Sequence, residues 1–553
     1  MTTIGCAIVS GPDPSPLDSR PQHVAPVPLQ QLEGLLGARR VPPGAPDVAV
    51  TGVALASAGV RAGDLYAALP GARTHGARYA ADAVAAGAVA VLTDPAGLAD
   101  TQSAGVPTLV HERPRHRLGD VARTVYGDPA ASLLTIGVTG TQGKTTTTSL
   151  MGSALQACDR RPGVIGTLGT LVDGRPVRST LTTPEAPDLQ ALFAVMTEQG
   201  TDACAMEVSS HALVQGRVDG VVFDVAVFLN LGRDHLDFHA DLEDYFAAKA
   251  GLFTERRARH AVVDIDDEHG RRLVAQTPLP VTTVALDQPA DWRAEDLSIG
   301  PGGATYTLAG PDGRRWDAAV PLPGTFNVRN ALAATVALVV AGLDVAAVVA
   351  GVAGAPGVPG RMERVSSTLP ELSAADAAIA ASASDNSAGG AGVEGGDDVS
   401  VVVDYAHKPD ALAAVLAALR PTTPGRLWVV LGAGGDRDRG KRPLMGQVAA
   451  ERADVVVVTD DNPRTEDPAA IRAAVLAGAR TGPADVREVA DRGRAVRSAV
   501  LDAAPGDCVL VAGRGHESGQ EVAGTTHEFD DRDVARAALV ERVRRRSGPA
   551  GGR

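Results

Sequence analysis

One glycine-rich segment constrains the fold of this chain more than any other stretch. It reads Gly137-Val-Thr-Gly-Thr-Gln-Gly-Lys-Thr-Thr146 and lies between an apolar, strand-like run at 133–138 and a helical pattern that begins at Lys144. Glycines let backbone N–H groups approach phosphate oxygens, the helix N-terminus adds partial positive charge, and lysine and threonine address phosphates and Mg²⁺. The strict Walker pattern would require glycine at 138, where valine stands. The segment therefore matches the shorter GTxGKT form. We therefore predict a nucleotide-binding loop; a glycine turn without a ligand is the alternative.

Length, charge and cysteine usage exclude several classes of protein. A chain of 553 residues holds about three to five folding units. Its net charge of −14 and hydrophobic content of 44% are typical of a soluble globular protein without the broad basic face of a nucleic-acid-binding protein. The four cysteines are far apart and form no CxxC pair, which argues against disulfides and zinc and fits a reducing cytoplasm. We expect a cytoplasmic monomer.

The sequence predicts no membrane anchor. Its first residues lack the basic region and apolar segment of a signal peptide. The longest apolar stretch, 331–343, is shorter than the ~18 residues that suggest a membrane span. We interpret it as a buried helix.

Hydrophobic periodicity divides the chain into three α/β units. Strand-like runs at 48–55, 63–69, 88–94, 133–138, 203–208, 225–229, 261–265, 399–406, 426–432, 453–461 and 507–513 alternate with helical segments, which predicts mostly parallel sheets. The expected organisation is a mobile tail (1–27), a first unit (28–128), a central unit (129–365), a flexible Ala/Ser/Gly/Asp-rich insertion (366–398), a Rossmann-like third unit (399–546) and a terminal tail (547–553).

Lysine is rare in this chain. Only Lys144, Lys249, Lys408 and Lys441 occur among 52 basic residues. Arginine cannot replace an amine that must lose a proton, react with carbon dioxide or act as a compact charge on a phosphate. Each lysine is therefore a candidate for a specific role, whereas residual codon usage would scatter lysines at random.

Five further motifs follow the glycine-rich loop in a fixed order. They are Thr182-Thr-Pro-Glu185, Glu207-Val-Ser-Ser-His211, Asn230-Leu-Gly-Arg-Asp-His235-Leu-Asp, Leu322-Pro-Gly-Thr-Phe-Asn327 and Gly360-Arg-Met-Glu363. With the loop, this series resembles the Mur ligase family, and the resemblance extends from about residue 48 to 535. It implies an ATP-dependent ligase that phosphorylates a peptide carboxylate and lets an amine displace phosphate to form an amide. A carboxylate must be activated in this way because it is a poor electrophile.

The resemblance also implies roles for residues of the central unit. Lys144 and Lys249 would be catalytic, Lys249 as a carbamate, with Glu207 and His235. Mg²⁺ would be held by Thr145, Glu207, His235 and carbamylated Lys249. ATP would contact Gly140, Thr141, Gln142, Gly143, Lys144, Thr145, Thr146, Asn327, Arg361, Asp404 and His407. A surface acid, a structural histidine and a helix-surface lysine are the plain alternatives for Glu207, His235 and Lys249.

The resemblance implies that motifs of the third unit select the amine. Asp461-Asn462-Pro463-Arg464 resembles the motif of family members that add meso-diaminopimelate, whose extra carboxylate a guanidinium can grip bidentately. Arg437, Gly513 and Glu517 would complete this pocket. The resemblance thus implies addition of meso-diaminopimelate to UDP-N-acetylmuramoyl-L-alanyl-D-glutamate in peptidoglycan precursor synthesis. A turn is the plain alternative for the motif at 461–464.

The first unit would bind the uridine nucleotide, but its signature is altered. The family's Asp-Ser-Arg reads Ala56-Ser57-Ala58 here, and only Ser57 can be transferred. Five other candidates for holding the acidic muropeptide are Thr182, Thr183, Ser209, His211 and Arg217. Gln142, Asp264 and Arg514 are further departures from the common residues.

Three other functions remain as alternatives. A ligase of the same superfamily could use another amine, as a lysine-adding Mur ligase or a folylpolyglutamate synthase does. A non-catalytic nucleotide-binding regulator would keep the loop without turnover. A P-loop GTPase or kinase is disfavoured by the amine-site motifs.

Overall fold

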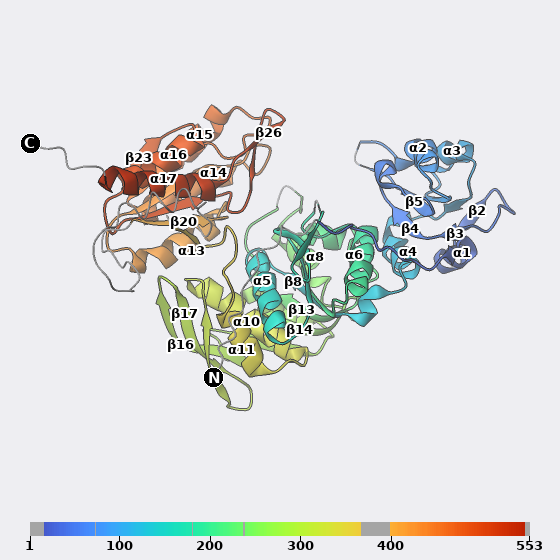
Figure 1. The fold of residues 1–553 in the computed structure, drawn as a ribbon, viewed down its shortest axis with the longest axis horizontal. Helices are drawn as coiled ribbons and strands as arrows, with labels where there is room; N and C mark the ends of the chain where they lie inside the picture. The colour runs from blue at the N-terminus through green and yellow to red at the C-terminus, as the bar shows by residue number, and fades with distance from the viewer. Residues whose placement is uncertain (1–15, 72, 180, 236–237, 367–398, 548–553) are drawn as a thin grey trace, which may run out of the picture.

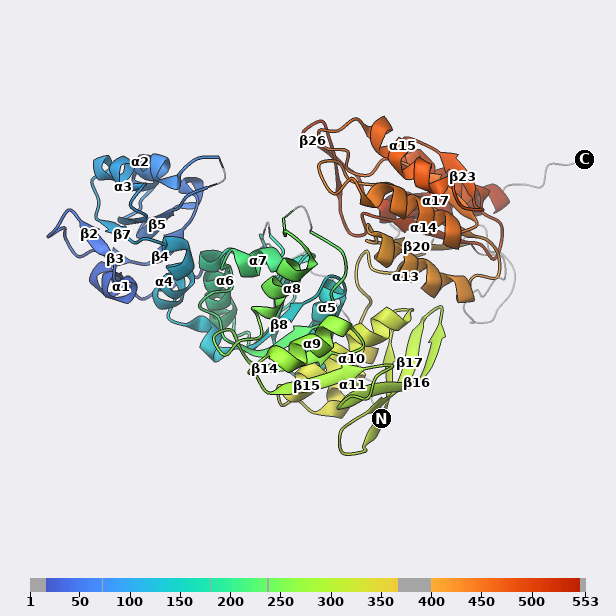
Figure 2. The same ribbon diagram turned by 180° about the vertical axis from the view of Figure 1, so that it is seen from behind.

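The computed structural model describes residues 16–71, 73–179, 181–235, 238–366 and 399–547. Figures 1 and 2 show three α/β units in chain order, with the central unit between the other two. The units are built around sheets of five, eleven and six strands. The predicted α/β fold class with three parallel-rich units is confirmed.

The N-terminal sheet has the strand order β2-β7-β6-β5-β4, and only β2 is antiparallel to its neighbour. Side chains alternate between its two faces, so Leu65 packs with α1 and α4 whereas Tyr66 packs with α2. The elements are β1 Val27–Pro28, α1 Leu29–Leu36, β2 Arg39–Val41, β3 Ala49–Val50, β4 Gly52–Ala54, β5 Asp64–Ala68, α2 Ala80–Ala85, β6 Ala90–Thr93, α3 Leu98–Thr101, β7 Thr108–Val110 and α4 Leu118–Val125.

The central sheet has the order β11-β10-β9-β12-β8-β13-β14-β15-β16-β17-β18. Its strands from β9 to β16 in this order are parallel, as predicted, but antiparallel strands extend both ends. The strands are β8 Leu134–Thr139, β9 Pro162–Gly166, β10 Gly169–Val172, β11 Arg175–Val177, β12 Ala203–Glu207, β13 Phe223–Phe228, β14 Ala258–Asp264, β15 Val281–Ala285, β16 Trp292–Gly300, β17 Gly303–Ala309 and β18 Arg315–Val320.

Helices cover both faces of the central sheet. One face packs with α5 (Lys144–Ala157), α10 (Thr325–Val340) and α11 (Val345–Ala353). The other packs with α6 (Ala186–Glu198), α7 (Ser210–Val214), α8 (Leu242–Ala250) and α9 (Glu268–Gln276). The apolar stretch at 331–343 lies mostly in α10, whose residues are buried nearly all round, as predicted. Within the described part of the chain, no helix is long and apolar enough to cross a bilayer.

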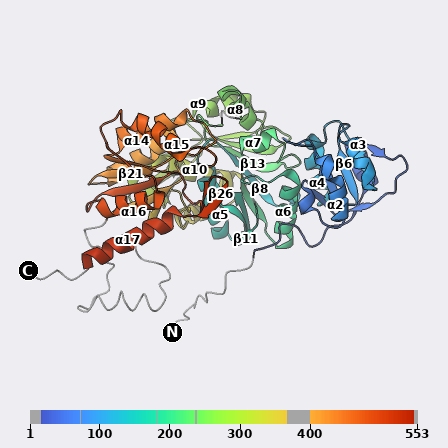
Figure 3. The ribbon, with the colours of Figure 1, turned by 90° about the horizontal axis from the view of Figure 1, so that it is seen from above.

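The C-terminal sheet has the order β19-β20-β24-β21-β22-β23, with β19 alone antiparallel to its neighbour. Figure 3 shows α14 and α15 on one side of this sheet and α16 and α17 on the other. The elements are β19 Glu363–Val365, β20 Ser400–Asp404, α13 Pro409–Leu419, β21 Leu427–Leu431, α14 Lys441–Arg452, β22 Val455–Val458, α15 Pro468–Ala479, β23 Asp485–Glu488, α16 Arg492–Asp502, β24 Cys508–Ala512, β25 Gly519–Val522, β26 Thr525–Glu528 and α17 Asp531–Ser547.

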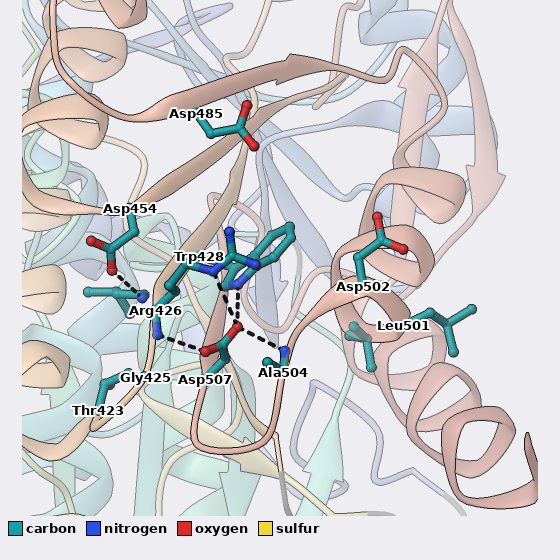
Figure 4. Close-up of polar contacts among 12 residues, drawn as sticks. Thr423, Gly425, Arg426, Trp428, Asp454, Asp485, Leu501, Asp502, Ala504 and Asp507 are labelled. Carbon is teal, nitrogen blue, oxygen red and sulfur yellow. Dashed lines mark hydrogen bonds and ion pairs between the residues drawn. The ribbon is translucent and has the colours of Figure 1, made fainter. Parts of the chain in front are cut away.

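A buried carboxylate fixes the start of two neighbouring strands in this unit. Asp507 accepts hydrogen bonds from the backbone N of Arg426 at 2.7 Å and of Ala504 at 2.9 Å, and from the indole N of Trp428 at 2.9 Å (Figure 4). Trp428 lies on β21 and Asp507 directly precedes β24. These bonds therefore help to fix the register in which β24 pairs with β21, and β24 ends just before Gly513.

The expected tail at 1–27 is wrong for residues 16–27. Arg20, Gln22 and His23 hydrogen-bond to residues of the first and central units, and Val27 begins β1. Distant acidic partners hold this Pro-rich segment, which local composition cannot reveal. Residues 1–15, nearly all of the expected insertion (367–398) and the expected terminal tail from residue 548 lie outside the described residues.

Candidate active site

The carboxyl ends of the central parallel strands open into a cavity of about 1010 Å³ that the third unit also lines. Ligands commonly bind at this edge of an α/β sheet. The cavity brings together most of the residues predicted from the sequence. Those that line it are Thr141, Gln142, Gly143, Lys144, Thr145, Thr146, Thr182, Thr183, Glu207, Ser209, His211, Arg217, His235, Asn327, Arg361, Asp404, His407 and Arg437.

The glycine-rich loop turns sharply between β8 and α5. Gly143 has φ of 89°, and a Cβ there would lie 2.2 Å from Oδ1 of Asn330, so this position requires glycine. Oδ1 of Asn230 accepts hydrogen bonds from the backbone N of Thr141 at 3.1 Å and of Gln142 at 2.9 Å. The loop is therefore shaped by Asn230, which follows β13, and by Asn330 on α10, as well as by its own glycines.

Two lysines lie beneath this loop. The Nζ atoms of Lys144 and Lys249 both donate to the carbonyl oxygen of Gly140, at 2.8 and 2.9 Å. Lys249 comes from α8, is 1% exposed and lies 4.5 Å above the ring of Tyr245. Burial, with the positive charges of Lys144 and Lys408, lowers the pKa of Lys249 well below its ordinary value. Burial also lowers the pKa of Lys144, although the charge of Glu207 opposes this.

Glu207 ends β12 at the floor of the cavity. It is 1% exposed, and its carboxylate accepts hydrogen bonds from the backbone N of Thr167 at 2.7 Å and from Oγ1 of Thr167 at 3.1 Å. Oγ1 of Thr183 donates to the backbone carbonyl of Glu207 at 2.9 Å, and Oγ1 of Thr182 lies 3.3 Å from that of Thr167. The predicted acid and the two threonines thus form one connected group.

The segment that follows β12, which includes α7, places three more predicted residues at the cavity wall. Ser209 caps α7 by accepting a hydrogen bond from the backbone N of Ala212. Arg217 pairs with Glu185 at 2.9 Å and donates to the carbonyl oxygen of Thr183 at 3.1 Å. The ring of His211 stacks on Phe238 with centroids 4.0 Å apart.

A cluster of aromatic rings joins these elements. His211 lies edge-on to His235 at 4.7 Å, and His239 lies 4.9 Å from Tyr245 between ring centroids. His239, which the sequence analysis does not single out, is buried and has both ring nitrogens within 3.0 Å of partners, Asp244 on α8 and Ser210 on α7. It follows His235 by four residues, but its two partners are brought to it only by the fold.

An ion pair spans the central and third units. Asp234 contacts both Lys408 and Nε2 of His235, the latter at 3.0 Å. Burial raises the pKa of Asp234, but the hydrogen bond from His235 and the charge of Lys408 outweigh it and hold the pKa well below its usual range. Lys441 donates to the carbonyl oxygen of His407 at 2.9 Å. All four lysines of the chain therefore lie at or beside the cavity.

The third unit contributes a buried rim to the cavity. Both carboxylate oxygens of Asp404 accept backbone hydrogen bonds, from Met362 at 2.7 Å and Ala406 at 2.8 Å, and burial raises its pKa. Arg361 stacks over Tyr405 at 4.3 Å and reaches Oγ1 of Thr145 at 3.4 Å. These contacts join the glycine-rich loop to the third unit.

One histidine and one asparagine complete this rim. Burial, with the charges of Lys408 and Lys441, lowers the pKa of His407 to about 3, so that its ring is neutral near pH 7. The amide of Asn327 is buried and donates to the carbonyl oxygen of Pro323 at 2.8 Å. Asn327 lies in the first turn of α10 and also lines the cavity.

The motif at 461–464 forms a second, adjoining cluster. Asn462 donates to Glu517 at 3.0 Å and accepts from Arg514, and Tyr405 donates to the other oxygen of Glu517 at 3.3 Å. Burial and the charge of Asp461 raise the pKa of Glu517. Gly513 lies beside Asp461, since a Cβ there would be 2.7 Å from Oδ2 of that residue.

Arg464 follows Pro463 with φ of 52° and donates from Nη1 to the carbonyl oxygen of Gly435 at 2.6 Å. Of the predicted amine-site residues, only Arg437 lines the large cavity, and its side chain is exposed. The motif is therefore assembled as a unit next to the cavity rather than within it.

Two sets of residues lie outside these expectations. Ser57 is in the N-terminal unit and does not line the cavity. The cavity wall also includes Asp234, Asp264, Arg329 and Tyr405, to which the sequence analysis assigns no role. Asp264 could have been found from its position, because it ends β14 as Glu207 ends β12.

Comparison with known proteins identifies the family. Three family models match: the Mur ligase family, catalytic domain (residues 49–126), the Mur ligase middle domain (138–338) and the Mur ligase, glutamate ligase domain (392–515). A UDP-N-acetylmuramoyl-L-alanyl-D-glutamate--2,6-diaminopimelate ligase of Streptomyces avermitilis is 50% identical over 528 residues, covering 94% of this chain and 98% of the relative. A UDP-N-acetylmuramyl-tripeptide synthetase of Leifsonia xyli is 44% identical over 539 residues, covering 96% and 99%.

A solved structure agrees with these matches. The structure of a UDP-N-acetylmuramoyl-L-alanyl-D-glutamate--2,6-diaminopimelate ligase is 35% identical, with a TM-score of 0.61, and the similarity covers 90% of this chain and 96% of that one. The matched models extend over more than half of the chain and include both sides of the cavity. The chain belongs to the Mur ligase family.

Proposed function

We propose that this protein is the ATP-dependent ligase that joins meso-diaminopimelate to UDP-N-acetylmuramoyl-L-alanyl-D-glutamate in peptidoglycan precursor synthesis. The observation that carries this proposal is the convergence of the glycine-rich loop, Glu207 and Lys144 on one cavity that the third unit also lines, with the buried Lys249 bonded to the same loop carbonyl as Lys144. The names of the full-length relatives support the substrates. The first unit (28–128) would bind the UDP sugar, the central unit (129–365) ATP and the third unit (399–546) the amino acid.

The reaction must bring two anions together. A carboxylate oxygen of D-glutamate attacks the γ-phosphorus of ATP, ADP leaves, and an acyl phosphate forms. The amine nitrogen then attacks the acyl carbon, phosphate leaves and the nitrogen loses a proton as the amide forms. Lys144 and Arg361, both at the cavity wall, would offset the repulsion between the triphosphate and the carboxylate.

Lys249 is suited to carbamylation. Its amine nitrogen would bond to the carbon of carbon dioxide and lose a proton, giving an anionic carbamate. This step requires a neutral amine, and the lowered pKa of Lys249 supplies one. The carbamate charge would also relieve the crowding of Lys144, Lys249 and Lys408.

The residues present fit Mg²⁺. Thr145 and Glu207 offer the oxygen ligands that this ion prefers, and a Lys249 carbamate would add another. In the described ranges, no group of three or more His, Cys, Asp or Glu side chains is placed to hold a metal ion. Mg²⁺ usually keeps several waters and binds through one or two carboxylates and the substrate phosphates. Mg²⁺ would supply positive charge at the phosphates. His235 directs Nε2 at Asp234, so coordination through this nitrogen requires that pair to break.

The amine would be recognised by the cluster around Asn462. Arg464 would bind the distal carboxylate of diaminopimelate, with Arg437, and Glu517 would pair with the distal ammonium. The name of the tripeptide-synthetase relative specifies no amine, and a lysine-adding activity stays the nearest alternative. A lysine substrate lacks the distal carboxylate and would leave Arg464 without its partner.

We place the reaction in the cytoplasm and expect a monomer. Cys158, Cys204 and Cys508 are free thiols, as a reducing compartment allows. We expect small-molecule substrates, and the net charge of −14 argues against nucleic acid as a partner.

A competition assay tests the function. Purified protein with ATP, Mg²⁺ and UDP-N-acetylmuramoyl-L-alanyl-D-glutamate is offered diaminopimelate, lysine and glutamate in turn, and phosphate release and product mass are measured. We expect stoichiometric phosphate and product with meso-diaminopimelate. Turnover with lysine or glutamate instead would assign another amine, and ATP binding without any turnover would leave a nucleotide-binding regulator.

A further inference from the structure

The loop that follows β4 lacks two residues of the family signature. Ala56-Ser57-Ala58 has neither the acid nor the guanidinium that flank serine in that signature. Ser57 begins a short 3₁₀ helix, Ser57–Gly59, at the carboxyl end of the N-terminal sheet. Neither alanine can fix this helix by a charged side chain.

Arg20 supplies a guanidinium at this place from far upstream. Its Nη1 donates to both carboxylate oxygens of Asp64, at 2.7 and 2.8 Å. Its Nη2 donates to the carbonyl oxygens of Val53 at 3.2 Å and Gly59 at 3.3 Å. One side chain thus connects the end of β4, the start of β5 and the last residue of the Ser57 helix.

The ion pair is protected from solvent. Asp64 is 2% exposed and Arg20 13% exposed. Asp64 also accepts a hydrogen bond from the backbone N of Arg61, so its carboxylate organises the return of the loop into β5. A planar guanidinium can satisfy two carboxylate oxygens and two carbonyls together, whereas an ammonium cannot reach all four.

The segment that carries Arg20 is itself held by the central unit. The backbone N of Leu17 donates to the carbonyl oxygen of Pro176, on β11, at 2.9 Å. The backbone N atoms of Gln22 and His23 donate to the carboxylate of Glu198, at the end of α6, at 2.9 and 2.8 Å. In Figure 3 this dark blue segment runs from the β11 edge past α6 to the N-terminal unit. We call residues 17–23 the strap.

We propose that Arg20 is a positioning residue for the uridine-nucleotide substrate, and that it holds the Ser57 loop in place of the guanidinium missing from position 58. This proposal rests on the proposed function, which assigns the Ser57 loop to the uridine nucleotide. Because the strap is fixed to the central unit, it also aligns that loop with the muropeptide residues at Thr182 and Thr183. Arg20 acts through the loop and has no part in the bond-forming steps.

The test compares three variants of the full chain. Arg20→Ala removes the guanidinium, and Arg20→Lys keeps a charge beside Asp64 but loses the four-point contact. Arg61→Ala is the matched control, because the Arg61 side chain pairs with Asp18 of the same strap and both side chains are about half exposed. Its guanidinium bonds to Asp18 rather than to Asp64 or to the carbonyl oxygens that Arg20 binds, and the substitution keeps the backbone N–H that bonds to Asp64. KM for each substrate, kcat, the Kd of the UDP-dipeptide by calorimetry and Tm are measured.

We expect Arg20→Lys to fold with a Tm close to that of the parent. Its KM and Kd for the UDP-dipeptide should rise tenfold or more, while KM for ATP and for diaminopimelate stays within twofold; Arg20→Ala should show a larger rise. Arg61→Ala should leave every KM within twofold. A purely structural role would reduce kcat through loss of folded enzyme and leave KM unchanged.

Two results would overturn the proposal. One is an unchanged affinity of both Arg20 variants for the UDP-dipeptide. The other is an equal loss in Arg61→Ala, which would assign the effect to attachment of the strap in general. The parent enzyme separates this proposal from the function itself: if the parent neither binds nor converts the UDP-dipeptide, the proposed function fails, whereas an active parent with unaffected variants refutes Arg20 alone.

Discussion

Lys144 and Lys249 share one hydrogen-bond acceptor, the carbonyl oxygen of Gly140, although they come from different helices. Two ammonium groups on one carbonyl repel each other strongly away from water. Lys249 is the more buried of the two, and burial together with the charges of Lys144 and Lys408 lowers its pKa well below the ordinary value. The neutral form of Lys249 is therefore favoured, and this is the form that reacts with carbon dioxide.

The first prediction concerns that reaction. In ¹³C-bicarbonate, we expect a single carbamate carbon signal by NMR, from Lys249. Because the chain has only four lysines, substitution of individual lysines can assign this signal. The signal should be absent from Lys249→Ala and present in Lys441→Arg. Lys249→Ala should lose activity and recover part of it with a short carboxylic acid, whereas Lys144→Ala should not respond to the acid. A fully active Lys249→Ala enzyme would contradict the role.

The second prediction concerns Asp264. Burial raises its pKa to about 7 from 3.8, and the nearby charges of Asp266 and Asp267 act in the same direction, against Arg329. The folded protein thus binds this proton more tightly than the unfolded chain does. The resulting stability is complete below pH 3.8 and is lost as the pH rises through about 7.

Asp264→Asn removes this dependence while keeping the shape of the side chain. At 1.36 kcal/mol per pKa unit, the free energy of unfolding of the variant relative to the parent should rise by about 3 kcal/mol between pH 5 and pH 8. Thermal or urea unfolding at the two pH values measures the difference. Parallel stability curves for the parent and the variant would show that Asp264 does not titrate in this range.

The third prediction concerns the choice of amine. Arg464→Ala should raise KM for diaminopimelate about 10- to 100-fold, the size of a lost hydrogen bond to a charged group, and leave KM for ATP unchanged. The variant should also discriminate less against lysine. Steady-state kinetics with each amine decide this, and Arg480→Ala serves as a surface-arginine control on the same unit. Equal KM values in parent and variant would remove Arg464 from the amine site.

Local signals were sufficient to predict much of the fold. The glycine-rich loop, the strand β8 before it and the helix α5 after it form one continuous stretch, so their chemistry and their structure are both visible in the sequence. The same holds for Glu207 at the end of β12. The strands β16 to β18, which pair antiparallel with one another, are not predicted, because they present many polar and exposed residues and lack the apolar runs of the central strands.

Long-range pairs could not be predicted in the same way. Asp234 and Lys408 are 174 residues apart, and Arg20 and Asp64 are 44 apart. Neither member of these pairs has a local pattern that names its partner, and so the tail at 16–27 was expected to be mobile. His239 is a similar case, because its partner Ser210 lies on α7, 29 residues earlier in the chain.

The last prediction tests a buried ion pair next to the proposed amine site. Arg492 on α16 and Asp531 on α17 are both fully buried and form two hydrogen bonds of 2.8 Å; Arg492 also donates to the carbonyl oxygen of Ala512, next to Gly513. Removing one partner leaves an unpaired buried charge, so Asp531→Ala should destabilise the third unit by about 3–5 kcal/mol. The exposed pair of Arg497 and Glu541 joins the same two helices, and Arg497→Ala should cost less than about 1 kcal/mol. Unfolding of both variants is followed by thermal denaturation. Similar losses of stability in the two variants would mean that burial does not govern the strength of these ion pairs. The position of Gly513 would then depend on β24, which precedes it, and not on the pair of Arg492 and Asp531.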